Sequence, residues 1–178
     1  MVSVFCIGHA VQDLVFSIDK MPSNAIKYSA SAFKTIGGGP AATAAVAISK
    51  LGGSARLASR VGEDILANFT IAELESYDVD CSLVERINGN QTSTSAVLVD
   101  GAGERMIINF QDGSITSDIK WLKKNFPVDS NAVLADTRWP EAGIYGLEFA
   151  KKKGIPAVLD ADVPVPKDER LVNAATHV

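Results

Sequence analysis

Short apolar segments alternate with helical segments along most of the chain, and this alternation restricts the possible folds more than any other feature. Four apolar runs are typical of buried strands, namely 2–8, 54–62, 131–136 and 155–162. Helical patterns occupy the segments 40–51, 64–80, 117–126 and 140–154. Strands that alternate with helices predict an α/β fold with a central parallel sheet, helices on both faces and right-handed crossovers.

Three of these helices carry local signals. The helix at 40–51 is the clearest prediction, because Pro40 suits a first turn and the alanine-rich segment after it favours a helix. The helix at 64–80 is amphipathic, and four of its side chains are expected to face the core: Ile65, Phe69, Ala72 and Leu74. Ser117 is expected to cap the third helix.

Two pairs of alternating segments do not fit the strand–helix order. Segments 13–19 and 27–36 flank a turn, so Lys27 is expected to begin the second strand of a hairpin. Segments 92–100 and 104–110 flank another turn and predict a second hairpin. The two hairpins are expected to form a small separate β-sheet beside the main one. The tail from residue 163 onward shows no further strand.

Composition excludes several classes of protein. The chain has 178 residues, enough for one domain, and 47% of them are hydrophobic, which argues against disorder. Its net charge of −4 argues against a nucleic-acid partner. No apolar run approaches the roughly 18 residues of a membrane span. Cys6 and Cys81 have no CxxC partner and the N-terminus has no leader pattern, so we expect a cytoplasmic protein.

The glycine-rich segment 37–53, GGGPAATAAVAISKLGG, has several possible roles. It can be a purely structural turn into a helix, and it lacks the lysine of a phosphate-binding P-loop. It also spells G-x-G-x-x-A from Gly37 to Ala42, with Glu63 and Asp64 further on, which leaves a nicotinamide-dependent oxidoreductase as an alternative. That fingerprint should directly follow the first buried strand, and here an alternating segment precedes it. Glycine amides facing a hydroxylated or anionic small molecule are the fourth possibility.

Motifs in a defined order decide between these possibilities. They are IGHAVQD, the glycine-rich GGGPAATAAVAISKLGG, RVGEDILANFTIAELESYDVD and the hairpin TSTSAVLVDGAGERMIINF. In this order they resemble the ribokinase-like (PfkB) family of carbohydrate kinases along the whole chain. The resemblance implies a ribokinase-like α/β fold with a β-sheet lid, a sugar substrate, ATP and Mg²⁺ as cofactors, and a homodimer formed through the lid. Residues 1–178 would be the N-terminal, substrate-binding part, with lid segments at about 12–35 and 90–110.

The catalytic motif of that family is absent from this sequence. The family's base belongs to a G-A-G-D motif that opens a helix. The nearest match, Gly101-Ala102-Gly103-Glu104, leads into the strand 104–110 instead. The chain is therefore expected to contain no catalytic residue and no metal ligand, and to be inactive alone. A non-catalytic sugar-binding fragment remains a further alternative.

The resemblance also assigns substrate contacts. Asp13 matches the family's acceptor of sugar hydroxyls, and the glycine turn would lie against the sugar through Gly37, Gly38 and Gly39. Ala42 stands where many members carry a sugar-binding asparagine, which argues against ribokinase activity proper.

Within the family, the segments GGGPAATAAVA, GERMIINF, LADTRW and VLDAD are similar to those of sulfofructose kinases. Lys27, Asn109 and Arg138 are accordingly expected to converge as a clamp on the anionic end of a ketose such as 6-deoxy-6-sulfofructose. His9, after the first strand, could line the same pocket and is given no catalytic role.

Overall fold

The computed structural model describes residues 1–162 and 169–178, which contain a five-stranded and a four-stranded sheet. The five-stranded sheet is parallel throughout, with the order β5-β4-β1-β8-β9. Its strands are Val79–Ile87 (β5), Ser54–Gly62 (β4), Ser3–Ile7 (β1), Ala132–Asp136 (β8) and Ala157–Asp160 (β9). From β1 the chain first adds β4 and β5 on one side of the sheet, and it later adds β8 and β9 on the other side. The carboxyl ends of β1 and β8 therefore form a switch point, where open α/β sheets bind ligands.

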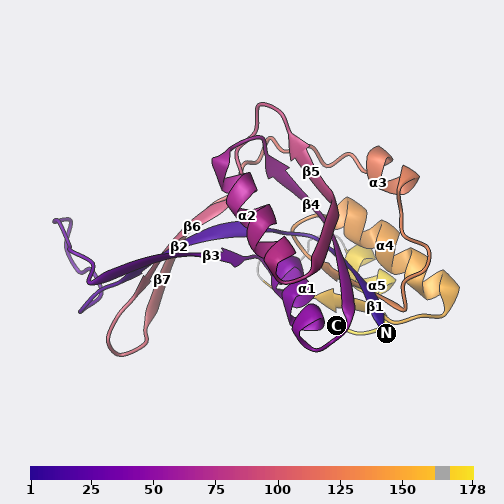
Figure 1. Cartoon of the computed structure of the whole chain (residues 1–178), viewed down its shortest axis with the longest axis horizontal. Coiled ribbons are helices and arrows are strands. Elements are labelled where there is room, and N and C mark those ends of the chain that lie inside the picture. The colour runs from indigo at the N-terminus through magenta and orange to yellow at the C-terminus, as the bar shows by residue number, and fades with distance from the viewer. Residues whose placement is uncertain (163–168) are drawn as a thin grey trace.

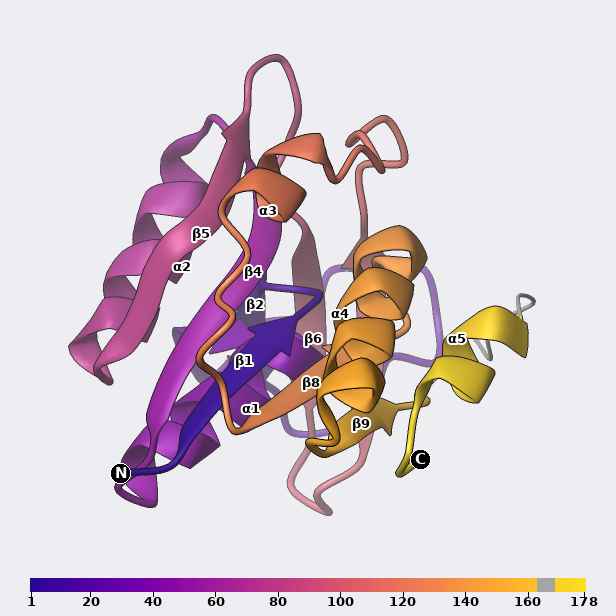
Figure 2. The same ribbon diagram turned by 90° about the vertical axis from the view of Figure 1, so that its right-hand side faces the viewer.

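Helices cover both faces of this sheet, with α4 and α5 in front and α1 behind in Figure 2. The helices are Pro40–Lys50 (α1), Ile65–Ser76 (α2), Lys120–Lys124 (α3), Pro140–Lys153 (α4) and Glu169–Ala174 (α5). Phe5 and Ile7 belong to the core beneath α4 and α5, whereas Cys6 belongs to the core beneath α1 and α2. Successive residues of β1 thus fill opposite layers, as the strand period requires. We call the sheet and its helices the body.

The four-stranded sheet projects from the body as an arm (Figure 1). Its order is β3-β2-β6-β7, with bounds Ala32–Gly38 (β3), Val11–Ser17 (β2), Thr94–Val99 (β6) and Arg105–Phe110 (β7). β2 pairs antiparallel with β3, β6 pairs antiparallel with β7, and β2 pairs parallel with β6. The arm therefore consists of two hairpins side by side. These findings confirm the predicted α/β class, the parallel sheet and the separate small sheet.

The predicted buried face of α2 is wrong. Three of the four predicted core side chains are exposed, namely Ile65 (61%), Phe69 (56%) and Ala72. The helix instead buries Ala67, Thr70 and Leu74. Asp64 caps this helix, because its Oδ1 accepts from the N–H of Ala67. Its Oδ2 accepts from the N–H of Thr92 at 2.7 Å and so joins the start of the helix to a distant segment.

The prediction of Ser117 as a helix cap is also wrong. α3 begins only at Lys120, and its N-terminus has no side-chain cap. The carbonyl of Ser117 instead accepts a hydrogen bond from Nε1 of the buried Trp139 at 3.3 Å. Residues before α3 are thus held by an aromatic side chain of the body and not by a helix-capping hydroxyl.

Lys27 does not begin a strand, contrary to the prediction. β3 starts at Ala32 because β2 ends at Ser17, and these two residues are the last pair of the hairpin. Residues 18–31 have no partner strand to continue the ladder. Lys27 therefore lies exposed in the connection at the far end of the arm.

Two elements were not predicted. β5 is an edge strand of the parallel sheet, and its mixed burial explains why its sequence lacks a clear apolar run. α5 follows in the tail, where the sequence pattern predicted no strand. Within residues 169–178 the only strand-like pairing is the isolated bridge of His177 to Val158, and residues 163–168 lie outside the described part.

Candidate functional site

The arm carries a row of polar side chains across three strands. Asp13 of β2 pairs with Ser95 of β6, and Ser95 pairs with Asn109 of β7. Residues that pair directly have their side chains on the same face of a sheet. Within the row, Nδ2 of Asn109 donates to Oγ of Ser95 at 3.0 Å. A carboxylate, a hydroxyl and an amide thus lie side by side.

A cavity of about 240 Å³ separates this row from the body. The arm contributes Val11, Asp13, Ser95, Val97, Ile107 and Asn109 to its lining, and the body contributes His9, Gly39, Pro40, Arg138 and Asp162. We call it the arm–body cavity. It lies at the switch point of the sheet, because His9 follows β1 and Arg138 follows β8. Its volume, below the roughly 300 Å³ at which drug-sized sites begin, suits a small ligand.

Two glycines allow the turn before α1 to pack closely on this site. A Cβ at Gly38 would lie 2.5 Å from Oδ2 of Asp13, so any side chain there would displace the carboxylate. Gly39 has a φ of 95°, and a Cβ at this position would collide with the carbonyl of His9. The glycine turn therefore brings Asp13 and His9 to the start of α1.

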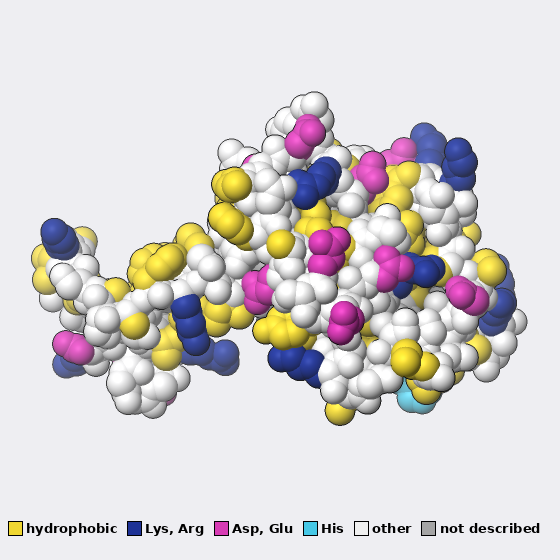
Figure 3. Space-filling model, in the orientation of Figure 1, with side chains coloured by type: hydrophobic (Ala, Val, Ile, Leu, Met, Phe, Trp, Pro, Cys, Tyr) yellow, Lys and Arg dark blue, Asp and Glu magenta, His cyan; other side chains and the backbone are white. Residues whose placement is uncertain are grey.

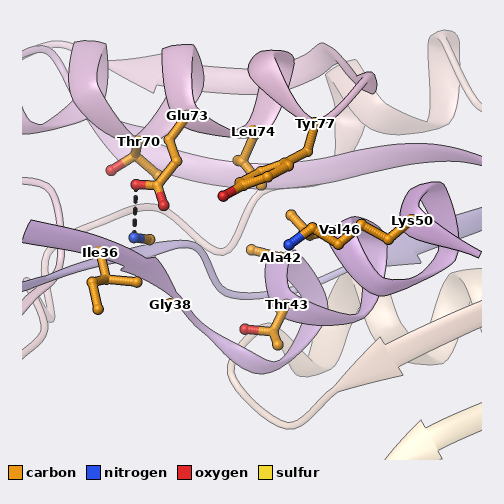
Figure 4. A pocket seen from close by; sticks show the side chains of 11 residues that line it. Ile36, Gly38, Ala42, Thr43, Val46, Lys50, Thr70, Glu73, Leu74 and Tyr77 are labelled. Carbon is orange, nitrogen blue, oxygen red and sulfur yellow. Dashed lines mark hydrogen bonds between the residues drawn. The ribbon is translucent and has the colours of Figure 1, made fainter.

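The other side of the same turn faces a second cavity of about 170 Å³ between α1 and α2 (Figure 4). Gly37 and Gly38 line this second cavity and not the arm–body cavity. The N–H of Gly37 donates to Oε2 of Glu73 at 2.8 Å, which is the dashed line in Figure 4. The predicted contact of Gly37 with a sugar has no support in this arrangement, because its amide is already bound.

Asp136 was not among the predicted site residues, yet it organises the body side of the cavity. Its buried Oδ2 accepts from the N–H groups of His9 at 2.7 Å and Ala41 at 3.1 Å. Its Oδ1 accepts from the N–H of Arg138 at 2.8 Å. Burial raises the pKa of this carboxyl, and these hydrogen bonds oppose the rise. One carboxylate therefore fixes the end of β1, the start of α1 and the residues after β8.

Arg60 of β4 is a second residue that the sequence did not reveal. Its guanidinium donates to the carbonyls of Thr116 at 2.5 Å and Arg138 at 3.3 Å. It also lies over the ring of Trp139, 4.3 Å from the centroid. Burial lowers the pKa of Arg60 to about 10, so the side chain stays cationic at neutral pH. The RVG motif places an arginine here, but only the fold shows what it contacts.

The predicted site residues fall into three groups. Asp13, Gly39, Asn109 and Arg138 line the arm–body cavity together. Gly37 and Gly38 lie behind it on the glycine turn. Lys27 lies beyond Ser17, and Ser17 is itself about 13 Å along β2 from Asp13. Within one chain, Lys27 therefore does not converge with Asn109 and Arg138.

Two further sequence hypotheses concern a metal site and a dinucleotide site. Within residues 1–162 and 169–178, no group of three or more His, Cys, Asp or Glu side chains could hold a metal. Asp64, a candidate ribose contact in the dinucleotide hypothesis, is engaged in capping α2 and binding Thr92. Gly101-Ala102-Gly103-Glu104 forms the turn between β6 and β7 and opens no helix.

Membrane insertion through a helix also finds no support. Among the helices of the described residues, none combines the length and the apolar character that crossing a membrane would require.

Comparison with known proteins places the chain in a family. The family model of the pfkB family carbohydrate kinases matches residues 1–178. A deoxyribokinase from Salmonella typhi is 28% identical over 157 residues, which cover 86% of this chain and 51% of that protein. A ribokinase from Bacillus subtilis is 24% identical, with 100% of this chain and 61% of that protein covered. The chain thus spans about half the length of the first of these curated relatives.

Solved structures agree with the family match. A candidate ribokinase from Agrobacterium tumefaciens superposes with a TM-score of 0.86 at 32% identity, over 99% of this chain and 58% of that one. A ribokinase from Arabidopsis thaliana, solved with ribose and ATP, shares the fold with a TM-score of 0.82 at 22% identity over 98% and 58% of the two chains. With its sequence matched from end to end and its fold shared with these structures, the chain belongs to the pfkB family of carbohydrate kinases.

Proposed function

We propose that the protein acts as the substrate-binding part of an ATP-dependent kinase that phosphorylates a hydroxyl of a ketose. One observation carries the proposal: in a chain of the pfkB family, Asp13, Asn109 and Arg138 line one cavity at the switch point of the sheet. Phosphoryl transfer depends mainly on positioning and on electrostatic stabilisation. These residues supply the positioning of the sugar.

Asp13 holds the sugar in this proposal. A carboxylate accepts several hydrogen bonds, so one side chain can bind two neighbouring hydroxyls. The apolar side chains of Val97 and Ile107 line the same cavity beside it. They cover the sugar from the arm side and limit the access of water, which would otherwise compete as phosphoryl acceptor.

Asn109 and Arg138 bind the anionic end of the ketose. Arg138 offers a planar set of donors that suits a sulfonate or a phosphate. Asn109 keeps a second amide hydrogen for the ligand after its bond to Ser95. We therefore propose a ketose with an anionic end, such as 6-deoxy-6-sulfofructose, as the substrate.

ATP and Mg²⁺ bind mainly outside the described residues in this proposal. The support is the length of the curated relatives, of which this chain covers about half in the first case. ATP supplies the phosphoryl group once bound. The catalytic base would come from the family's G-A-G-D motif, which the sequence from 1 to 178 does not contain.

A homodimer through the arm completes the proposal. The face of the arm opposite Asp13 is apolar and exposed, with Phe33 (57%), Met106 (40%), Ile108 (65%) and Phe110 (45%) on it. Hydrophobic side chains are visible along the arm in Figure 3. A second copy of the arm would cover this surface. Packing of two arms is also the arrangement in which Lys27 of the partner subunit could complete the anion clamp.

The test is ADP release by a full-length protein with a C-terminal extension, measured with fructose, fructose 6-phosphate and 6-deoxy-6-sulfofructose. We expect turnover of an anionic ketose, and none by the 178-residue chain alone. If none of these three sugars stimulates the release of ADP, the kinase proposal is wrong. Protection of the protein from unfolding by NADH and not by ATP would favour an oxidoreductase instead.

Two variants test the substrate contacts in the same assay. Asp13→Ala should weaken sugar binding at least 10-fold, because each hydrogen bond to a charged group contributes about 1.5–3 kcal/mol. Arg138→Lys should weaken the anionic ketose and spare fructose, because lysine keeps the charge but loses the planar donor set. Unchanged KM values would show that Asp13 and Arg138 do not contact the sugar.

A further inference from the structure

Arg60 joins the segments that carry the two clamp residues of the proposed site. Thr116, whose carbonyl accepts from Arg60, lies in the connection that follows β7 and Asn109. The carbonyl of Arg138 accepts from the other terminal nitrogen. A single side chain of β4 thus contacts the end of the arm connection and the start of α4.

The backbone of Arg138 is held from both sides. Its N–H donates to Asp136 at 2.8 Å, and its carbonyl accepts from Arg60 at 3.3 Å. These two bonds restrain the backbone from which the Arg138 side chain projects. Loss of either contact would remove one restraint on the connection between β8 and α4.

An aromatic stack extends this support to α3. Trp139 lies under the Arg60 guanidinium and stacks on Trp121 of α3, with ring centroids 5.8 Å apart. Nε1 of Trp139 donates to the carbonyl of Ser117. Arg60, Trp139 and Trp121 therefore connect the residues after β7 with those after β8 through packed rings.

The charge of Arg60 also bears on the ligand. Arg60 and Arg138 both line a polar cavity of about 180 Å³ that adjoins the arm–body cavity and shares His9 and Arg138 with it. Among the described residues, Arg60 forms no salt bridge with a carboxylate within 4 Å, and its guanidinium contacts two backbone carbonyls and the ring of Trp139. This half-buried cation adds positive potential beside the clamp, which Asp112 and Glu141 in the same cavity partly offset.

We propose that Arg60 is the positioning residue that sets the anion clamp, and so determines the preference for an anionic ketose. This inference rests on the proposed function and deepens it, because it names the group that fixes Arg138 relative to the segment following Asn109. Lysine at position 60 would retain the charge but could not bridge two carbonyls and stack on a ring together.

The kinetic experiment uses Arg60→Lys in the full-length protein. We expect KM for 6-deoxy-6-sulfofructose to rise about 10-fold, with KM for fructose and kcat for both sugars unchanged. Arg56→Lys is the matched control, since Arg56 lies on the same strand and pairs with Asp80 at 2.5 Å away from the cavity. In Arg60→Ala, added guanidinium ion should restore part of the affinity for the anionic sugar.

The two tryptophans of the chain allow a binding test that needs no catalysis. Both lie in the Arg60 stack, so 6-deoxy-6-sulfofructose should change the fluorescence of the 178-residue chain, and the midpoint should shift about 10-fold in Arg60→Lys. The inference is wrong if the variant still turns over ketoses but loses affinity equally for 6-deoxy-6-sulfofructose and fructose. It is also wrong if neither affinity changes. Arg60-dependent binding without turnover in the full-length protein would overturn the kinase proposal alone.

Discussion

At the scale of single residues, Gly38 shows how closely the turn before α1 approaches the site. An ideal Cβ at this position lies 2.5 Å from Oδ2 of Asp13 and 3.0 Å from Cγ1 of Val11. The φ of Gly38 is not in the left-handed region, so the backbone itself tolerates a side chain. The constraint comes from the carboxylate of Asp13, which can rotate away.

Gly38→Ala is therefore expected to fold and to lose sugar affinity by about 10-fold, because the new methyl group displaces the Asp13 carboxylate. The measurement is KM for the sugar together with the thermal midpoint of unfolding. Gly37→Ala serves as control, since its Cβ would meet Glu73 in the second cavity and not Asp13. Equal KM values for the two variants would contradict the role given to Asp13.

His9 makes stability depend on pH. Burial, with smaller effects of Arg138 and Arg60, lowers its pKa from 6.5 to about 4. Between these pH values the unfolded chain binds a proton that the folded chain does not, so stability falls as pH falls through 6.5. Other charged groups near His9 are Asp136, which accepts from its N–H, and the carboxylates of the two adjoining cavities: Asp13, Asp112, Glu141 and Asp162.

His9→Phe should remove this dependence, because phenylalanine does not titrate. The free energy of unfolding of the wild type should fall relative to the variant by up to about 2 kcal/mol between pH 7.5 and pH 5. Urea unfolding of both proteins at the two pH values measures this difference. The contributions of the other titrating groups cancel, because both proteins share them. A constant difference across this range would show that His9 titrates normally.

At the scale of secondary-structure elements, Asp136 couples β1, β8, α1 and the start of α4. Its N–H donors belong to residues after β1, at the first turn of α1 and before α4. The parallel ladder that joins β1 to β8 stops at the pair Ile7 and Ala135, just before Asp136. A buried carboxylate replaces the ladder there, and the site is assembled around it.

Asp136→Asn should destabilise the protein by about 2–4 kcal/mol, because an amide nitrogen would face a backbone N–H in place of an acceptor oxygen. Asp160→Asn is the matched control, since Asp160 pairs with Asp136 in the neighbouring strand but is exposed. Chemical denaturation of both variants measures the effect. Similar stabilities would mean that the buried bonds contribute little.

These contacts also explain what the sequence could and could not predict. Strands and helices follow local patterns, and motif order led to Asp13, Asn109 and Arg138, which share a cavity. Asp136 looked like any residue at a strand end, because its role depends on donors more than ninety residues away. Lys27 was misplaced because alternation continues past the point where the partner strand ends.

At the scale of the whole molecule, the face of the arm toward the body carries the polar row of Asp13, Ser95 and Asn109 among apolar side chains, and the opposite face is apolar and exposed. Exposed apolar surface on a two-sided sheet is costly for a monomer and suits association. The exposed positions lie on both edge strands, β3 and β7, so the surface spans the width of the arm.

Ile108→Glu should shift the proposed dimer to monomer, because a charge would enter the apolar face on β7, where Ile108 is 65% exposed in the single chain. Sedimentation velocity measures the change, and circular dichroism checks the fold. Ile65→Glu is the control, since Ile65 is 61% exposed but belongs to the body. A wild-type chain that sediments as a monomer at every concentration would exclude the dimer.

The pairing of β2 with β6 has a consequence for how the molecule is made. Gln12 and Thr94 are neighbours in the arm, yet about 80 residues separate them, a delay of roughly 4–16 s at ordinary rates of translation. During that time the first hairpin has an open edge, because the backbone N–H and C=O groups of β2 that pair with β6 have no partner yet. The nascent chain is therefore most exposed to mispairing before residue 110 emerges, and slowing translation within residues 40–90 should lower the yield of folded protein.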